Sequence, residues 1–573
     1  MGDSTAYINN KGIAENSYDA IVIGSGISGG WAAKELCEKG LKTLVLERGR
    51  NIEHIKDYPT ANLSRWELPH RGQITHATQE QNPLISKAAG YGEDTQHFFV
   101  KDADHPYVQE KPFDWIRGYQ VGGKSLTWGR ACARWSEYDF TAPERYGYGA
   151  SFPIGYKEME DWYSYVEQFI GVCGNKDGIP SMPDGEFLPA YELNCVEQHL
   201  QKVIKEKFNR HYVSGRWAHI TEPKQIHKDQ GRTQCLNRNL CMRGCPLGGY
   251  FSSVSSTLPW AKKTGNLTIR PFSVVHSIIY DEQKGKAVGV KVIDTNTKQE
   301  TDFFAKIIFV NASALNTNLI LLNSQSKRFP NGLGNDSGLL GKYICFHNYR
   351  GSMYGEIDGF TDKYYKVAKP AECIVANFRN VPERNADFFG GYVIYSGASR
   401  RTLEEPAIHS IGAAYKDALA EPGGWGVYMY MQGETIAKET NHVRLSNDHK
   451  DQWGIPLLVT AVGYDENDDK MVKDFLEQGQ AMLEAAGVKN IHTNDSKQAP
   501  GLDIHEMGGV RMGSDPQKSL LNEWNQLHHC KNVFVTDGAC MTSTGSQSPS
   551  ILYMAFTARA VKHAVEELKK GNL

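Results

Sequence analysis

The residues Ile23-Gly24-Ser25-Gly26-Ile27-Ser28-Gly29-Gly30 contain the pattern G-x-G-x-x-G directly after a short apolar run. That run, residues 18–23, has the composition of a buried parallel strand. Residues 28–39 show the spacing of a helix with one apolar face, and the glycine at position 40 suits its C-cap. Residues 43–46 form a second expected strand. About 30 residues therefore predict a βαβ unit.

Each glycine of the motif has a separate physical purpose. Gly24 permits a tight turn out of the strand, Gly26 lets the backbone approach a pyrophosphate, and Gly29 lets helix and strand pack closely. The phosphates are expected at the helix N-terminus, around Ile27 and Ser28, where free N–H groups and the helix dipole attract anions.

An acidic residue completes the fingerprint. Glu47, followed by Arg48, stands 23 positions after Gly24 at the end of the second expected strand. A carboxylate in that place suits hydrogen bonds from ribose hydroxyls and disfavours a 2′-phosphate. The motif predicts a dinucleotide site, but by itself it does not choose between FAD and NAD.

Composition excludes several classes of protein. The 573 residues carry a net charge of -3, with 40% hydrophobic and 23% charged residues, which is ordinary for a globular protein and does not favour nucleic acid as a partner. The longest uncharged run, residues 307–326, holds four asparagines and is not expected to span a membrane. Residues 1–17 are polar and lack the features of a leader, so we expect a cytoplasmic protein. A periplasmic location is the alternative if a leader is missing from this sequence.

The remaining chain suggests one interrupted domain and one inserted domain. Helical spacing is found in residues 158–172, 465–486 and 550–568, whereas residues 374–458 hold several short β-like runs. We expect an α/β fold in which a Rossmann-like domain carries an inserted α+β substrate-binding domain built on an antiparallel sheet. The expected boundaries are 1–150, 220–345 and 500–573 for the first domain, and 151–219 and 346–499 for the second. Residues 50–115 have little periodicity and predict a lid, an arm or a surface excursion.

Three further segments narrow the choice of cofactor. Residues 118–129, GYQVGGKSLTWG, form a glycine-rich stretch, and residues 503–513, DIHEMGGVRMG, form a loop with one histidine. Residues 532–539, NVFVTDGA, are typical of a strand and turn with an acid at the end. Together with the fingerprint, these segments resemble the glucose–methanol–choline (GMC) family of flavin oxidoreductases. The resemblance is strongest to the branch that holds pyranose 2-oxidase, the flavin subunits of gluconate and fructose dehydrogenases, and glycoside 3-dehydrogenases.

The resemblance implies FAD as the cofactor and gives roles to residues along the whole chain. His505 would be the catalytic base facing flavin N5, because neutral imidazole accepts a hydroxyl proton at neutral pH as hydride leaves the carbon. Val275 would hold the adenine through its backbone. The other residues that the resemblance places at the cofactor are Gly122, Gly123, Ser125, Asp537, Gly538, Pro549 and Ser550.

Two positions depart from the pattern of the family. In pyranose 2-oxidase a histidine of the first glycine-rich stretch is bonded covalently to the flavin, and Thr127 aligns with it here, which predicts noncovalent FAD. Family members place His or Asn at a second catalytic position, where this chain has Ser548. Serine can donate a hydrogen bond to the substrate oxygen but reaches less far, and Gln547 or a water molecule is expected to help. Alternatively, Ser548 only caps the last helix.

Further polar residues are candidates for the substrate site. His347, Gln432 and Glu434 are expected either to line a substrate pocket or to be surface polar groups. Cys235, Cys241 and Cys245 form C-x5-C-x3-C-P, for which a structural loop is favoured over a thiol relay or a disulfide. The eleven cysteines are odd in number and sparse, so most are expected as free thiols, and no set has the spacing of a metal site.

The expected activity is oxidation of a secondary ring hydroxyl of a sugar or glycoside to a ketone, with a 3-keto-glycoside favoured. The alternatives are an oxygen-using oxidase of the pyranose 2-oxidase type, a gluconate 2-dehydrogenase-type flavin subunit, and a non-catalytic flavoprotein. The electron acceptor is open between a quinone, a dye-like carrier and a partner subunit, and a homo-oligomer is possible.

Overall fold

The computed structural model describes residues 16–363, 369–400, 411–420 and 423–573. It confirms the βαβ unit: β1 (Ser17–Ile23) is followed by α1 (Ile27–Glu38) and β2 (Thr43–Leu46). The two strands pair in parallel, with Ile23 opposite Leu46. The side chains of β2 are buried along their whole length, as expected for a strand covered on both faces.

The first sheet joins both ends of the chain. Its strand order is β5 (Leu267–Arg270), β2, β1, β8 (Glu300–Val310), β7 (Lys286–Asp294) and β6 (Ser273–Asp281). β17 (Val533–Val535) also pairs with β8, in parallel, so a strand from the last 50 residues lies in the same sheet as the N-terminal strand. β6, β7 and β8 form an antiparallel meander on one edge. The expected α/β fold with a Rossmann-like first domain is confirmed.

Helices cover this sheet and position its carboxyl edge. α1 packs against α11 (Ser550–Lys570) and α7 (Thr257–Lys263), and α11 packs against α4 (Tyr156–Ile170). The uncharged run from Ile307 turns out to be the end of β8 followed by α8 (Ala314–Asn323), buried inside the domain. Within the described residues, no helix combines the length and the apolar character needed to cross a membrane.

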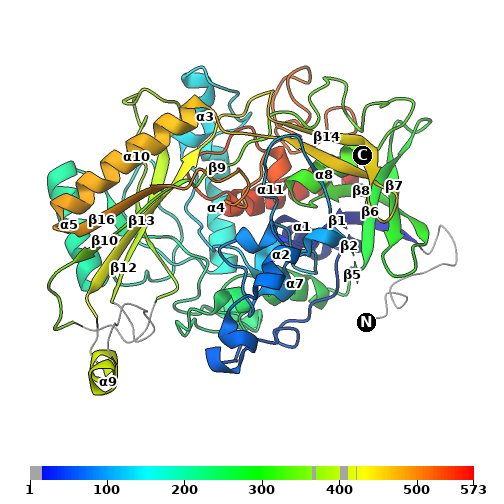
Figure 1. The fold of residues 1–573 in the computed structure, drawn as a ribbon. Helices are drawn as coiled ribbons and strands as arrows, with labels where there is room; N and C mark the ends of the chain where they lie inside the picture. Colours follow the sequence, from blue (N-terminus) through cyan, green and yellow to red (C-terminus); the bar gives the residue numbers. More distant parts are fainter. Residues whose placement is uncertain (1–15, 364–368, 401–410, 421–422) are drawn as a thin grey trace.

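The second sheet is antiparallel and lies at the other end of the molecule (Figure 1). Its order is β16 (Lys489–Asp495), β10 (Gly351–Ile357), β13 (Trp425–Glu434), β12 (Tyr392–Arg400), β11 (Cys373–Val375) and β4 (Tyr212–Ser214), and β9 (His347–Asn348) pairs with β13. This confirms the antiparallel sheet expected within residues 374–458. The domain boundaries given above remain predictions.

Strand alternation gives the second sheet two different faces. On β13, Val427, Met429 and Met431 point into a core that they share with α5 (Cys195–Phe208) and α10 (Glu466–Ala485). Successive side chains of a strand point to opposite faces, so Tyr428 and Tyr430 face away from these helices. Figure 1 shows α10 lying along the helix-covered face. The face that carries the tyrosines is therefore turned towards the rest of the molecule.

Residues 50–115 have little regular structure but pack against the body. They include α2 (His76–Gln81) and β3 (Val108–Gln109), which pairs in parallel with β15 (Pro456–Ala461) next to β14 (His442–Lys450). Phe98, Phe113 and Trp115 are buried. The segment is a packed excursion in this conformation, and a function as a lid or arm remains a prediction. Three further α-helices among the described residues are α3 (Glu137–Arg145), α6 (Gln225–Asp229) and α9 (Ala413–Ala420).

Candidate active site

A cavity of about 650 Å³ runs from the carboxyl edge of the first sheet to the tyrosine face of the second. Fourteen of the residues singled out from the sequence line it: Gly24, Gly26, Ile27, Ser28, Glu47, Arg48, Gly123, Ser125, Val275, His505, Asp537, Gly538, Ser548 and Ser550. They come from segments that are more than 500 residues apart in the chain, so the cavity brings together the N-terminal and the C-terminal motifs.

The N-terminus of α1 forms one end of the cavity. Gly24 has φ of +94°, and a Cβ added there would lie 2.3 Å from the backbone oxygen of Asn311. A Cβ added at Gly26 meets no protein atom within 4 Å, so its backbone faces open space. The helix has no side-chain cap and no acid in its first turn. Its free N–H groups are thus available to an anion such as a pyrophosphate.

Hydrogen bonds join the fingerprint to the glycine-rich loop. One oxygen of Glu47 accepts from the backbone N–H of Ser25 at 3.2 Å and from its hydroxyl at 2.5 Å, and the other accepts from Gly49 at 3.0 Å. The Ser25 oxygen accepts in turn from the N–H of Gly122 at 2.9 Å. Burial raises the pKa of Glu47, and these hydrogen bonds oppose the rise. Glu47 therefore connects two loops by hydrogen bonds and also lines the cavity. Gly29 and Gly122, which were also expected at the cofactor, do not line the cavity.

A second helix N-terminus faces the same space. Ser550, which lines the cavity, is the first residue of α11, and Pro549 precedes it as an N-cap without a side-chain hydrogen bond. Asp537 is held by hydrogen bonds from the hydroxyl of Thr317 at 2.6 Å and from the N–H of Ala539 at 3.0 Å. Burial raises the pKa of Asp537 to about 6.

Several buried polar atoms on the cavity wall fit a large polar ligand. Within the described residues, eight such atoms have no hydrogen-bond partner: Arg48 Nε, Arg117 Nη2, Arg130 Nε, His276 Nε2, Asn311 Nδ2, Asp503 Oδ1, Glu506 Oε1 and the hydroxyl of Tyr553. Buried polar groups are nearly always paired, so unpaired ones mark places where a ligand or water supplies the partner. The guanidinium of Arg48 also stacks between the rings of Tyr119 and Trp453, at 4.7 and 4.9 Å. These features, with two open helix N-termini, fit a dinucleotide such as FAD.

His505 lies at the junction between this end and the tyrosine face. Its Nδ1 is 2.9 Å from Nδ1 of His347, and Nε2 of His347 is 3.0 Å from the carbonyl oxygen of Gly545. A carbonyl can only accept, so Nε2 of His347 carries the proton and its Nδ1 accepts. Nδ1 of His505 must then donate, which leaves the lone pair on its Nε2.

The electrostatics of this pair favour neutral rings. Burial lowers the pKa of His347 to about 4. Burial also holds the pKa of His505 well below its usual value, and the charges of His347 and Lys124 add to the effect. Asp503 accepts from the backbone N–H groups of His347 at 2.8 Å and His505 at 3.3 Å. Burial raises the pKa of Asp503 to about 7, with a contribution from Glu506.

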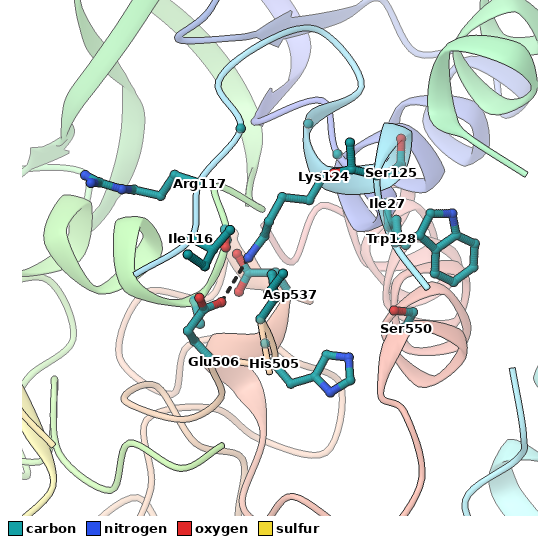
Figure 2. A pocket seen from close by; sticks show the side chains of 18 of the residues that line it. Ile27, Ile116, Arg117, Lys124, Ser125, Trp128, His505, Glu506, Asp537 and Ser550 are labelled. Atoms are coloured by element: carbon teal, nitrogen blue, oxygen red, sulfur yellow. Dashed lines mark hydrogen bonds and ion pairs between the residues drawn. The ribbon is translucent and has the colours of Figure 1, made fainter. Parts of the chain in front are cut away.

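An ion pair crosses the cavity beside His505. Lys124 reaches down from the glycine-rich loop, and its Nζ lies 3.0 Å from Oε2 of Glu506 (Figure 2). The Glu506 carboxylate is 2% exposed, so the ammonium group is its principal counter-charge. This pair was not expected from the sequence, because 382 residues separate its members.

The second predicted catalytic position is held by a network of side chains. The Ser548 hydroxyl donates to Oε1 of Gln432 at 3.2 Å, and Nε2 of Gln432 donates to the carbonyl of Ser546 at 3.0 Å. The proton of Ser548 is therefore directed to the protein in this geometry, and the oxygen is left as an acceptor. Ser548 lines the cavity, but Gln432 stands behind it.

The remaining predicted substrate residues lie off the cavity wall. His347 is fully buried and is hydrogen-bonded to His505 and Asp503 of the cavity wall. Gln547 is fully buried, and within the described part of the chain its amide has no hydrogen-bond partner. Glu434 lies at the end of β13 beneath Tyr148, whose hydroxyl is 3.4 Å away. Their positions at strand ends predicted that these residues lie at an edge of a sheet. Packing of the surrounding elements decided which side chains reach the cavity.

Aromatic and acidic residues that were not singled out from the sequence form the opposite wall. Tyr349, Tyr395, Tyr428 and Tyr430, here called the tyrosine wall, line the cavity together with Glu372. The rings of Tyr395 and Tyr430 stack with centroids 5.3 Å apart. The alternating sequence VYMYMQ at 427–432 was the available signal, since it separates a methionine face from a tyrosine face.

The clustered cysteines take no part in the cavity lining. Cys235, Cys241 and Cys245 carry free thiols in a loop of residues 232–250, and all eleven cysteines are free. Burial raises the pKa of Cys241. Among the described residues, the group that meets the geometry of a metal site is His347, Asp503 and His505, which belongs to the hydrogen-bonded pair above. Thr127, by contrast, lines the cavity.

Comparison with known proteins agrees with this geometry. Residues 18–347 match the N-terminal and residues 437–557 the C-terminal family model described as GMC oxidoreductase. The chain is 25% identical to the fructose dehydrogenase large subunit of Gluconobacter japonicus, covering 97% of this chain and 99% of the relative. It is 27% identical to 2-methyl-1,2-propanediol dehydrogenase of Mycolicibacterium austroafricanum, covering 95% and 94%. A variant of formate oxidase from Aspergillus oryzae has the same fold, with a TM-score of 0.61, 10% identity and coverage of 97% and 99%. The chain therefore belongs to the GMC oxidoreductase family and is an FAD-dependent oxidoreductase that acts on CH–OH groups.

Proposed function

We propose that the protein oxidises a secondary ring hydroxyl of a sugar or glycoside to a ketone, with His505 as the base. The observation that carries this proposal is the lone pair on Nε2 of His505, which follows from the bonds between His505, His347 and Gly545. A neutral imidazole whose free nitrogen faces a ligand cavity can accept a hydroxyl proton. Bound FAD supplies the acceptor for the hydride that leaves the same carbon.

The protein's own residues would position the substrate and the charge. The hydroxyl that reacts would donate to Nε2 of His505 and lie against Ser548, while the tyrosine wall holds the rest of the ring. Aromatic faces suit the C–H faces of a sugar. The proton on His505 would be stabilised through His347 and the carboxylate of Asp503. The 3-keto-glycoside stays the favoured product by resemblance to glycoside 3-dehydrogenases.

The relatives support a carbohydrate and also suggest a second candidate. The first relative is named for fructose, a polyhydroxylated sugar. The second is named for 2-methyl-1,2-propanediol, so a small branched diol is the alternative substrate. The fructose dehydrogenase relative is a large subunit, which makes a partner subunit one candidate electron acceptor, beside a quinone or a dye-like carrier.

We also propose that FAD is bound noncovalently, because Thr127 has no imidazole ring and cannot form the histidyl link to the flavin. Precipitation with acid should release the yellow colour into the supernatant. Colour that stays with the pellet would refute the assignment of Thr127.

The activity is tested by anaerobic bleaching of the flavin with a panel of sugars, glycosides and small diols, followed by product analysis. His505→Ala should bind FAD but reduce it about 10²- to 10⁴-fold more slowly, which is the usual contribution of a general base. His492→Ala is the matched control, since His492 is an exposed residue of β16 outside the cavity. Unchanged bleaching in His505→Ala would dismiss His505 as the base.

A further inference from the structure

The directions of the hydrogen bonds along the tyrosine wall decide whether a ligand must supply donors or acceptors. Burial raises the pKa of all four hydroxyls, so each holds a single proton at working pH. Tyr428 donates to Oε1 of Glu372 at 3.0 Å, and Tyr430 donates to Oε2 at 2.6 Å. Tyr349 donates to Oε1 of Gln432 at 3.3 Å. Three of the four protons are thus directed into the protein.

The fourth proton follows from the neighbouring bonds. Gln432 donates through its Nε2 to Ser546, so its Oε1 is an acceptor, and it accepts from Ser548. The hydroxyls of Tyr395 and Ser548 lie 3.2 Å apart. Since the proton of Ser548 is already placed on Gln432, Tyr395 donates to Ser548. Every hydroxyl on this wall therefore offers only lone pairs to the cavity.

Two of the N–H donors next to the wall are committed to protein acceptors. The indole of Trp217 donates to the backbone oxygen of Glu372 at 3.1 Å. The ammonium group of Lys369 binds the carboxylate of Glu197. Arg130 donates through Nη1 to the carbonyl of Trp128 at 2.6 Å, whereas its buried Nε has no partner among the described residues. Its positive charge lowers the pKa of Glu372 against the rise caused by burial.

The wall has two functional ends joined by one stacked pair of rings. Tyr395, bonded to Ser548, lies at the His505 end, and Tyr430, bonded to Glu372, lies at the other. Their centroids are 5.3 Å apart and their planes differ by 20°. His505, the two stacked rings and Glu372 line the same cavity, so one ligand can contact both ends of the wall.

We propose that this acceptor-only wall selects a neutral polyhydroxylated substrate that donates one hydroxyl to the His505–Ser548 end and a second, distal hydroxyl to Glu372. This inference rests on the proposed function and specifies its substrate class. A monohydric alcohol leaves the Glu372 end without a donor. A sugar acid brings a carboxylate against a buried carboxylate and a row of oxygen lone pairs, which is unfavourable.

Binding without turnover tests the substrate class. The flavin-loaded His505→Ala variant is titrated by calorimetry with methyl β-D-glucopyranoside, D-fructose, myo-inositol, D-gluconate, cyclohexanol and propane-1,2-diol. At least one neutral polyol should bind 10-fold or more tightly than gluconate, cyclohexanol and the diol. Equal or tighter binding of gluconate, cyclohexanol or the diol, or no preference for any polyol, would overturn the inference.

The role of Glu372 is tested with the polyol that binds best and its mono-O-methyl derivatives, which keep an oxygen but lose a donor. One derivative should bind about 10- to 100-fold more weakly, the range for a hydrogen bond to a charged group. In Glu372→Gln that ratio should fall towards 1, and in Tyr430→Phe it should fall in part. Tyr354→Phe is the matched control, because Tyr354 lies opposite Tyr428 on β10 but is 41% exposed and off the cavity.

The outcomes separate this inference from the proposed function. If Glu372→Gln keeps the wild-type ratio while sugars still bleach the flavin, the distal contact is wrong and the sugar oxidation stands. If polyols bind with the expected ratios but no carbohydrate bleaches the wild-type flavin, the proposed function fails and the acceptor wall stands.

Discussion

The Nδ1 atoms of His347 and His505 lie 2.9 Å apart, and one of the two must carry the shared proton. The carbonyl of Gly545 decides which, since it takes the only proton of a neutral His347. His347 is thus a positioning residue: it touches no substrate, but it directs the lone pair of His505 towards the cavity.

This relationship predicts the behaviour of two His347 variants. His347→Ala should leave FAD binding intact and slow flavin reduction by about 10- to 100-fold, the range for the loss of a partner that orients a functional histidine. His347→Gln should recover part of the rate, because its amide oxygen can accept from Nδ1. Nitrogen-15 NMR of the histidine rings should show the Nδ1–H tautomer at His505 in the wild type and a tautomer mixture in His347→Ala. An unchanged tautomer in His347→Ala would contradict the relay.

The raised pKa of Asp503 predicts a pH dependence for flavin reduction. With its pKa at about 7, Asp503 becomes charged as the pH rises through neutrality. That charge stabilises the imidazolium formed at His505, whose own low pKa keeps it neutral over the same range. The rate of anaerobic reduction, measured by stopped flow between about pH 5.5 and 9, should therefore rise through about pH 7. Asp503→Asn should abolish this rise, and a wild-type profile in Asp503→Asn would exclude the carboxyl as its source.

Substitution of two glycines of the fingerprint should affect two different properties, the binding of FAD and the stability of the fold. Gly26→Ala places its Cβ in open space, so the apoprotein should keep its melting temperature while FAD binds about 10-fold or more weakly, as expected where a backbone must approach the pyrophosphate. Gly24→Ala adds a clash with Asn311 at a φ of +94°, so it should destabilise the fold itself by about 1–3 kcal/mol. Thermal unfolding of both apoproteins and a flavin-fluorescence titration distinguish them. Equal melting temperatures for the two variants would contradict this assignment.

Glu434 should make the protein less stable as the pH rises. Burial, with a contribution from Asp139, raises its pKa in the folded state to about 8, above the unfolded value of 4.5. The unfolded chain therefore loses this proton first, and the free energy of unfolding falls between pH 4.5 and 8, by up to about 5 kcal/mol at about 1.4 kcal/mol for each unit.

Glu434→Gln tests this assignment by removing the titrating group while it keeps an acceptor for the N–H of Gly391. Denaturant unfolding should show a smaller loss of stability between pH 5 and 8 in this variant than in the wild type. Glu206→Gln, at an exposed position of α5, is the control and should keep the wild-type slope. A wild-type slope in Glu434→Gln would show that other groups cause the dependence.

Much of the fold follows from local patterns in the sequence. Gly24 and Gly26 predicted the turn and the helix start because a positive φ and a missing Cβ are properties of single residues. The short β-like runs within residues 374–458 predicted an antiparallel sheet, and β12 and β13 pair in that way. The GMC resemblance added His505 and Asp537, which both line the cavity.

The tertiary structure decided the chemistry around those residues. His347 is separated from His505 by 158 positions and Lys124 from Glu506 by 382, so no local pattern could pair them. The sequence placed Glu434 and Gln547 among the candidates, but packing turned them away from the cavity, and it placed Glu372 and the tyrosine wall there instead. The sequence by itself predicted a flavin-binding fold with one candidate catalytic histidine, because these predictions depend on short motifs. Only the tertiary structure decided which nitrogen of that histidine is free and which hydrogen bonds a substrate can make. Both depend on contacts between distant segments, because the position of a proton depends on every acceptor within its reach.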